Sequence, residues 1–215
     1  HGRSAGIRGH IHRFEDYLTD VAACLRVVVD QCAGQRPILL GHSLGGLIAT
    51  DYAAGHPETI RCLILSSPLW GLNVPVPWWK HALAYGLSWV GPSLTMRRPK
   101  AGAQVLSHDP QVQVRYLNDP LVHFQASCRF YVELRRRLAQ LPQTVGRLTV
   151  PILILQAGDD QIASAEATAR LFPAVASSQK RLVTYDGYYH ELFNEVERER
   201  VFHDLVTWLR SIGVR

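Results

Sequence analysis

Four short stretches of this 215-residue chain are largely apolar, and segments with helical spacing separate them. The four stretches are Pro37–Leu40, Cys62–Leu65, Val150–Leu155 and Arg181–Tyr185. Strands that are apolar on both faces are typical of parallel sheets that helices cover on both sides. The alternation therefore predicts an α/β fold with a mostly parallel sheet.

Helical patterns fill the gaps between the apolar stretches. Apolar residues recur at helical spacing from Phe14 to Val28, and Gly34 follows where a C-terminal cap belongs. Further helices are expected over Leu44–Tyr52 and over about Ala165–Phe172. The last helix is amphipathic, and we expect one face of it to carry Val201, Phe202, Leu205, Val206 and Leu209.

Composition divides the chain into three stretches, 1–67, 68–149 and 150–215. The middle stretch holds ten Lys or Arg against three Asp or Glu, four of the five tryptophans and eight of the twelve prolines. We interpret it as an insertion between two halves of one α/β core. The overall net charge of +5 is too diffuse to predict a nucleic-acid partner. No apolar run reaches the roughly 18 residues that a membrane span needs.

The four cysteines indicate a reducing compartment. Cys24, Cys32, Cys62 and Cys128 show no CxxC spacing, and they are too few for a disulfide scaffold. We therefore expect free thiols and a cytoplasmic location. Because the chain begins at His1 rather than at a methionine, it carries no information on a secretory signal.

A G-x-S-x-G pattern runs from Gly41 to Gly45, directly between an expected strand and an expected helix. A tight strand–turn–helix connection at this place would hold Ser43 on strained backbone and expose its hydroxyl. Both glycines are expected to be required, because a Cβ at either would collide with the neighbouring strand or helix. The alternative is a serine that merely caps a helix beside glycines. We predict that Ser43 is a nucleophile.

A serine hydroxyl needs a base that takes its proton and an acid that orients the base. His190 follows the last apolar stretch and is the expected base, whereas His203 falls inside the final helix. The acid is expected in the loop after the third stretch, where Asp159 and Asp160 are adjacent. Since successive side chains point apart, either could face His190 while the other caps a turn.

The chain resembles the serine α/β-hydrolases of the monoacylglycerol lipase/lysophospholipase group, the Hydrolase-4 or serine aminopeptidase S33 type. The residues that carry the resemblance span almost the whole chain: His1-Gly2-Arg3-Ser4, Gly6, Arg8-Gly9-His10, Phe14, Asp16-Tyr17, Gly41–Gly46, Ser107–Pro110, Asp119–His123, Gly158, Asp160, Ile162 and Tyr188–Glu195. The resemblance implies the α/β-hydrolase fold and places the acid two residues before Ile162. It thus implies the triad Ser43, Asp160 and His190, with Asp159 as the alternative acid.

The start of the chain departs from the family pattern. Family members begin with several more strands, and the loop after one of them donates an N–H to the oxyanion hole. Since His1 matches the loop after the last of those strands, we expect an N-terminally truncated hydrolase. The backbone N–H of Leu44 is then the oxyanion donor present, and the Pro37–Leu40 strand lacks its usual neighbour. Such a chain should be less active and less stable than an extended one.

The 68–149 insertion stands where the family places a helical cap over the active site. Its start, Pro75-Val76-Pro77-Trp78-Trp79, has two interpretations. These are ordinary core residues of the cap, or they are exposed aromatics that adsorb to a lipid surface together with Lys80, Arg97, Arg98 and Lys100. The run Arg135-Arg136-Arg137 predicts a solvated helix face that would also favour anionic headgroups.

The expected function is hydrolysis of carboxylic esters, and the resemblance implies monoacylglycerols or lysophospholipids as substrates. Ser43 would attack the ester, His190 would shuttle the proton, and water would release the fatty acid. No cofactor, metal or nucleic-acid partner is expected, and the oligomeric state is undefined by the sequence.

Two alternatives to this function stay open. The first is an aminopeptidase or small-ester hydrolase with the same triad, for which the insertion offers only Asp109, Asp119 and Glu133 as partners for a substrate ammonium. The second is a non-catalytic, truncated remnant that only binds. Dehalogenases and epoxide hydrolases of this fold carry aspartate at the elbow, so Ser43 argues against them.

Overall fold

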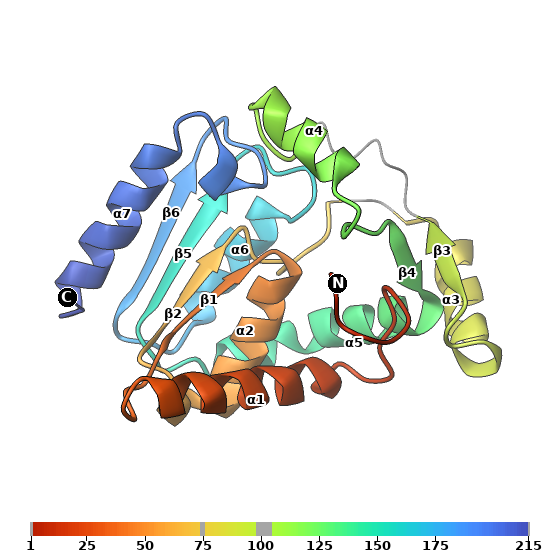
Figure 1. The fold of residues 1–215 in the computed structure, drawn as a ribbon, viewed down its shortest axis with the longest axis horizontal. Coiled ribbons are helices and arrows are strands. Elements are labelled where there is room, and N and C mark those ends of the chain that lie inside the picture. Colours follow the sequence, from red (N-terminus) through yellow and green to blue (C-terminus); the bar gives the residue numbers. More distant parts are fainter. Residues whose placement is uncertain (1, 74–75, 98–104, 215) are drawn as a thin grey trace.

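A parallel sheet forms the centre of the molecule. The computed structural model describes residues 2–73, 76–97 and 105–214. The described strands of this sheet follow the order β1-β2-β5-β6, and all neighbours are parallel (Figure 1). Their bounds are β1 Ile38–His42, β2 Cys62–Ser66, β5 Ile152–Ala157 and β6 Lys180–Tyr185. They coincide with the four apolar stretches, so the predicted α/β class is confirmed.

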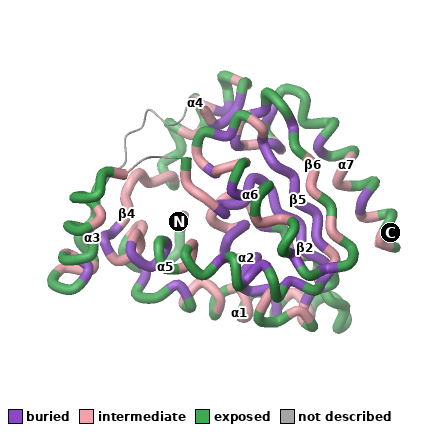
Figure 2. The backbone as a smooth tube through the Cα atoms, turned by 180° about the vertical axis from the view of Figure 1, so that it is seen from behind, coloured by how far each residue is buried: buried purple, intermediate pink, exposed green. Residues whose placement is uncertain are grey.

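Helices cover both faces of the sheet (Figure 1). On one face lie α1 (Glu15–Gln31), α2 (Leu44–Gly55), α5 (Cys128–Val145) and α6 (Ala165–Leu171). On the other face lies α7 (Arg198–Ser211). In β2, Leu63 and Leu65 pack with the first set, whereas Cys62 and Ile64 pack with α7. Strands β2 and β5 are buried along their whole length, as Figure 2 shows, which explains their unbroken apolar sequence.

The apolar face of α7 differs in part from the predicted one. Val201 and Trp208 are buried, and Leu205 and Leu209 pack beside them. Phe202 and Val206, however, are exposed, so the prediction was wrong for these two. Phe202 lies one position, about 100°, further round the helix than the buried Val201, and Val206 lies one position beyond the partly buried Leu205. The Phe202 ring stacks on the Phe193 ring instead.

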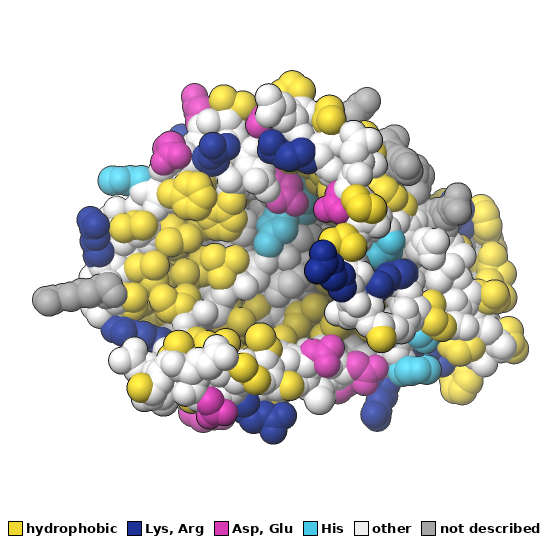
Figure 3. All heavy atoms as spheres, viewed as in Figure 1, with side chains coloured by type: hydrophobic (Ala, Val, Ile, Leu, Met, Phe, Trp, Pro, Cys, Tyr) yellow, Lys and Arg dark blue, Asp and Glu magenta, His cyan; other side chains and the backbone are white. Residues whose placement is uncertain are grey.

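Strand β1 forms an edge of the sheet. It pairs with β2 alone among the described strands, in line with the expectation for Pro37–Leu40. Ile38 and Leu40 are 37% and 47% exposed. Figure 3 shows a gathering of hydrophobic side chains in a hollow of this side of the molecule, above α1. An unpaired apolar edge of this kind is a site for pairing with another chain.

The 68–149 stretch contains two different parts. Its described elements before α5 are α3 (Trp78–Val90), β3 (Thr95–Arg97), α4 (Pro110–Asn118) and β4 (Gln125–Ser127). Strands β3 and β4 pair antiparallel and lie with α3 to one side of the parallel sheet, whereas α4 lies beyond its carboxyl-terminal edge (Figure 1). Helix α5 instead contributes Leu134, Leu141 and Val145 to the main core.

The tryptophans of this stretch divide between core and surface. Trp70 is buried, and its Nε1 donates a hydrogen bond to Thr50 Oγ1 at 3.0 Å. Trp78, Trp79 and Trp89 are 80%, 51% and 78% exposed, so Trp78 and Trp79 are not core residues of the cap, and adsorption to lipid stays a prediction. Pro75, Arg98, Lys100 and the Arg97 side chain lie outside the part of the chain that the structure describes.

Arg137 does not lie on the predicted solvated face. Arg135 and Arg136 are exposed as expected, but Arg137 is nearly buried. Its Nη1 lies 3.0 Å from Asp51 Oδ2, and its Nη2 pairs with Glu15. Consecutive helical residues point about 100° apart, so three arginines in a row cannot share one face. Arg137 thereby links α5 to α1 and α2.

Loss of this buried pair should destabilise the fold strongly. Arg137→Ala is expected to lower the free energy of unfolding by about 3–5 kcal/mol, because it leaves the buried Asp51 without its counter-ion. Arg135→Ala, an exposed neighbour, is the control and should change it by less than about 0.5 kcal/mol. Urea unfolding measures both, and equal effects would contradict the structural role of Arg137.

Two further findings bear on the sequence-based expectations. Within the described ranges, no helix has the length and apolar character that crossing a membrane requires. All four cysteines are free, as expected; Cys24 and Cys32 are exposed, and Cys62 and Cys128 are buried. Burial raises the pKa of the Cys62 thiol to about 11, so this thiol is inert near neutral pH.

Candidate active site

Ser43 lies at a sharp turn between β1 and α2. Its φ of 53° and ψ of −121° are strained for a residue with a side chain. The turn is held by the Ser43 N–H, which donates to Ser66 O at 3.0 Å, and by the Ser43 carbonyl, which accepts from the amides of Gly46, Leu47 and Leu69. This is the strand–turn–helix elbow that the sequence predicted.

The glycines of the elbow serve partly different purposes from those expected. A Cβ on Gly41 would stand 2.5 Å from Gly45 O, so Gly41 is required as predicted. A Cβ on Gly45 would meet nothing within 4 Å, so that part of the prediction was wrong. The close approach occurs one residue later, where a Cβ on Gly46 would lie 2.9 Å from Pro68.

His190 and Asp160 form a buried hydrogen-bonded pair. His190 Nδ1 lies 2.7 Å from Asp160 Oδ2. The other carboxylate oxygen, Oδ1, accepts from the amides of Ile162 and Ala163 at 2.8 and 2.9 Å. Asp159 is exposed, and its backbone N–H donates to Tyr188 O. Of the two adjacent aspartates, Asp160 is therefore the one that faces His190.

The elbow and the His190–Asp160 pair lie next to each other. The ring of His42, which directly precedes Ser43, lies 4.7 Å from the His190 ring between centroids. Since a carboxylate can only accept, His190 Nδ1 donates to it, and Nε2 of the neutral ring carries the lone pair. Among the described residues the Ser43 hydroxyl makes no hydrogen bond, and in free enzymes such contacts are often long before substrate binds.

A second histidine–carboxylate pair, His42 and Glu191, stands beside the first. His42 Nδ1 donates to Ser66 O at 3.0 Å, and its Nε2 lies 3.4 Å from Glu191 Oε1. Burial alone would raise the pKa of Glu191, but its nearness to His42 holds that pKa below its usual value. No role for this pair was predicted from the sequence. Their places in the sequence could have indicated a role, because His42 directly precedes Ser43 and Glu191 directly follows His190.

Asn73 fixes the loop that carries the acid, and it was also missed. Its side-chain amide donates to Asp160 O at 2.6 Å, and its backbone N–H donates to Ile162 O at 3.1 Å. An open cavity of about 540 Å³ lies beside this loop, lined by Asn73, Gly158, Asp159, Asp160, Gln161 and Tyr189. No sequence motif marked Asn73, since its partners lie in a distant segment.

A smaller cavity separates α4 from the segment after His190. It measures about 190 Å³ and is lined by Leu106, Val112, Arg115, Tyr116, Asp119, Val122, Glu191 and Asn194. Its walls are therefore mixed and combine apolar side chains with the charged groups of Arg115, Asp119 and Glu191. Among the residues that the structure describes, no group of three or more His, Cys, Asp or Glu side chains is arranged to hold a metal ion.

A parallel sheet with helices on both faces and a serine at a sharp turn between a strand and a helix are typical of the α/β-hydrolase fold. A crystal structure of Paleococcus ferrophilus monoacylglycerol lipase matches with a TM-score of 0.88 and 30% identity, over 99% of this chain and 80% of that one. The chain belongs to the family described as serine aminopeptidase, S33 (Hydrolase_4), whose model matches residues 1–197.

Curated relatives agree with this assignment. The monoacylglycerol lipase of Mycolicibacterium smegmatis is 31% identical over 212 residues, which cover 98% of this chain and 75% of the relative. The phospholipase YtpA of Bacillus subtilis is 34% identical over 206 residues, which cover 94% and 77%. The resemblance seen in the sequence is thereby confirmed, as is the expectation of a carboxylic ester hydrolase.

Proposed function

We propose that this protein hydrolyses acyl esters of the monoacylglycerol or lysophospholipid class through an acyl-enzyme, with Ser43, His190 and Asp160 as the triad. One observation carries the proposal: a serine on strained backbone directly follows His42, whose ring lies 4.7 Å from the ring of a buried histidine that a carboxylate holds at 2.7 Å. This combination activates a serine hydroxyl as a nucleophile. The names of the similar lipases and phospholipase support the substrate class.

The proposed reaction has two steps. In the first, Ser43 Oγ attacks the ester carbonyl while His190 Nε2 takes its proton, and the Leu44 N–H stabilises the oxyanion from the first turn of α2. The imidazolium, stabilised by Asp160, then gives the proton to the departing alcohol. In the second step His190 activates water, which cleaves the acyl-enzyme, releases the fatty acid and restores Ser43.

We further propose that the part of 68–149 before α5 is a cap over this site, because α4 and the nearby cavity face the residues after His190. The three acidic residues of the stretch are already engaged. Asp109 and Asp119 accept from the amides of Gln111 and Leu121, and Glu133 pairs with Arg136. Glu133 lies on α5, outside the proposed cap, and Asp109 and Asp119 each cap a turn, which supports esters over aminoacyl substrates as the substrate class.

Parallel assays test this substrate class. Monoacylglycerols, lysophosphatidylcholine and p-nitrophenyl butyrate should be hydrolysed, whereas aminoacyl p-nitroanilides should not. The triad can cleave both bond types, so the difference must come from binding of the group beside the acyl carbon. Anilide cleavage faster than ester cleavage would contradict the proposal and favour the peptidase alternative.

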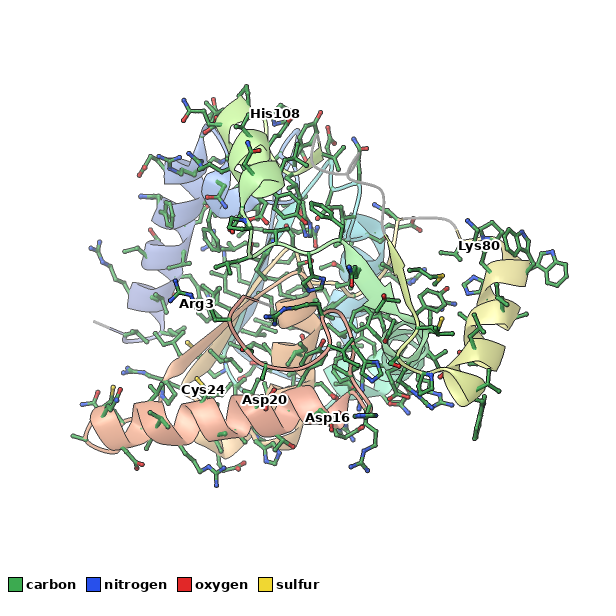
Figure 4. All side chains as sticks on the ribbon, turned by 45° about the vertical axis from the view of Figure 1, so that its right-hand side comes forward. Arg3, Asp16, Asp20, Cys24, Lys80 and His108 are labelled. Carbon is green, nitrogen blue, oxygen red and sulfur yellow. The ribbon has the colours of Figure 1, made fainter. Side chains whose placement is uncertain are left out.

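We also propose that α3 contacts a lipid surface, so that the protein works peripherally at a membrane. Trp78, Trp89, Trp79, Leu83 and Val90 are all exposed and fall within one side of the helix at helical spacing. Ala84 and Ser88 lie on the opposite side and are buried. The Lys80 ammonium lies 5.4 Å from the Trp79 ring (Lys80 is labelled in Figure 4), which puts a positive charge beside the aromatics. The free cysteines support a cytoplasmic location.

Vesicle binding tests the lipid contact. Replacing Trp78 and Trp89 with alanine should weaken binding to phosphatidylcholine/phosphatidylglycerol vesicles by at least about tenfold, because each large apolar side chain contributes roughly 1.5–3 kcal/mol on burial. Phe202→Ala, an exposed aromatic on α7, is the control and should bind as the wild type does. Salt should weaken wild-type binding. Equal binding by all three proteins would contradict a lipid contact through Trp78 and Trp89.

A further inference from the structure

Glu195 is a buried carboxylate that the proposed reaction does not use. Its side chain is 3% exposed. Oε1 accepts from the Tyr189 amide at 2.8 Å and from His108 Nδ1 at 3.0 Å, and Oε2 accepts from the His108 amide at 3.0 Å. A buried charge is tolerated only when such donors compensate it. Glu195 therefore joins two segments, one from the start of α4 and one that leads into His190.

The contacts of Glu195 lie on one side of His190, and a second anchor lies on the other. The amide of Glu191, the next residue, donates to Leu106 O at 2.8 Å. The His108 ring also stacks on the Tyr189 ring, with centroids 3.8 Å apart and planes at 19°. The backbone before and after His190 is therefore held by contacts that lead to residues 106–108, the segment that precedes α4 (His108 is labelled in Figure 4).

The Ser107 side chain provides a third contact between residues 106–108 and the segment after His190. Ser107 Oγ donates to Asn194 O at 2.8 Å and accepts from the Asp109 amide at 3.0 Å.

Burial alone would raise the pKa of Glu195, but the amides of Tyr189 and His108 and the His108 ring hold it below its usual value. The carboxylate is therefore ionised near neutral pH and accepts from every one of these donors.

We propose that Glu195, together with residues 106–108, is a positioning clamp that keeps His190 aligned with Asp160 and couples this alignment to α4. The inference rests on the proposed role of His190 as the general base. Glu195 acts through the Tyr189 backbone before His190, and Leu106 acts through the Glu191 backbone after it. The 190 Å³ cavity is lined by α4 on one side and by Glu191 and Asn194 on the other, so a ligand there touches both halves of the clamp. Displacement of a catalytic group by about 1 Å costs on the order of 10²-fold in rate.

Kinetics of Glu195→Gln and His108→Ala test the clamp. With p-nitrophenyl butyrate, Glu195→Gln should lower kcat roughly 10- to 100-fold while KM stays near the wild-type value, because the base is displaced and the acyl pocket is not. His108→Ala, which changes a half-exposed side chain, should lower kcat less. The double variant should be no slower than Glu195→Gln alone, since both changes break one unit. Glu199→Gln, an exposed glutamate on α7, is the matched control.

A spectroscopic readout separates failure of the clamp from failure of the proposed function. The His190 Nδ1 proton in the bond to Asp160 should give a downfield resonance in the wild type, assigned by its absence from Asp160→Asn. It should shift or vanish in Glu195→Gln and persist in Glu199→Gln, whether or not esters are hydrolysed. Absence of esterase activity in the wild type would contradict the proposed function and would leave the clamp untouched. An unchanged resonance in folded Glu195→Gln, or additive losses of kcat, would overturn the clamp.

Discussion

Replacing Ser43 with alanine is expected to abolish ester hydrolysis. The hydroxyl is the only group of the proposed triad that bonds to the substrate, and removal of such a nucleophile costs on the order of 10⁶ in kcat in a serine protease. The elbow should survive, because its hydrogen bonds come from the backbone of Ser43 and not from its side chain. Initial rates on p-nitrophenyl butyrate, with circular dichroism as a check on folding, measure the effect.

Ser178→Ala provides the control for this change. Ser178 is exposed in the loop before β6, far along the chain from the elbow, and its replacement should leave kcat near the wild-type value. Wild-type activity in Ser43→Ala would show that the nucleophile lies elsewhere in the protein.

Asp160→Asn should lower kcat on the order of 10⁴-fold, as the equivalent change does in a serine protease. The amides of Ile162 and Ala163 require an oxygen at the Oδ1 position, so asparagine would turn its NH₂ toward His190 Nδ1. The imidazole must then carry its proton on Nε2, where a base needs a lone pair. Kinetics on the same ester measure the loss.

The adjacent aspartate gives a matched comparison. Asp159→Asn changes the same atoms one residue earlier, on an exposed side chain, and should leave kcat close to that of the wild type. Inactivation by Asp159→Asn, with activity retained by Asp160→Asn, would reverse the assignment of the acid.

Local sequence patterns predicted the sheet, the elbow and the base. The apolar stretches could be recognised because β2 and β5 are buried on both faces, and Ser43 because its turn is formed by consecutive residues. The residues alone left Asp159 and Asp160 equivalent, since both stand in the same loop. What separates them is the pair of amides from Ile162 and Ala163, which only the folded loop brings to Asp160.

The supporting contacts of the site could not be predicted in this way. Glu195 and His108 are 87 residues apart in the chain, as are Asn73 and Asp160, and no spacing rule joins them. The sequence resemblance included Glu195 and Ser107 among its matching residues but gave neither a role. Arg137 illustrates a different difficulty: its run of three arginines indicated solvent exposure, whereas the position of Asp51 on α2 determined that one of them is buried.

Labelling with a fluorophosphonate probe tests the central proposal, that Ser43 is the activated nucleophile, most directly. The probe forms a covalent bond only with a serine whose hydroxyl is activated by a base. Intact mass should show one adduct on the wild type, and peptide mapping should place it on Ser43. Ser43→Ala should remain unlabelled, and Asp160→Asn should react far more slowly. An adduct on another serine, or labelling that persists in Ser43→Ala, would contradict the proposed mechanism.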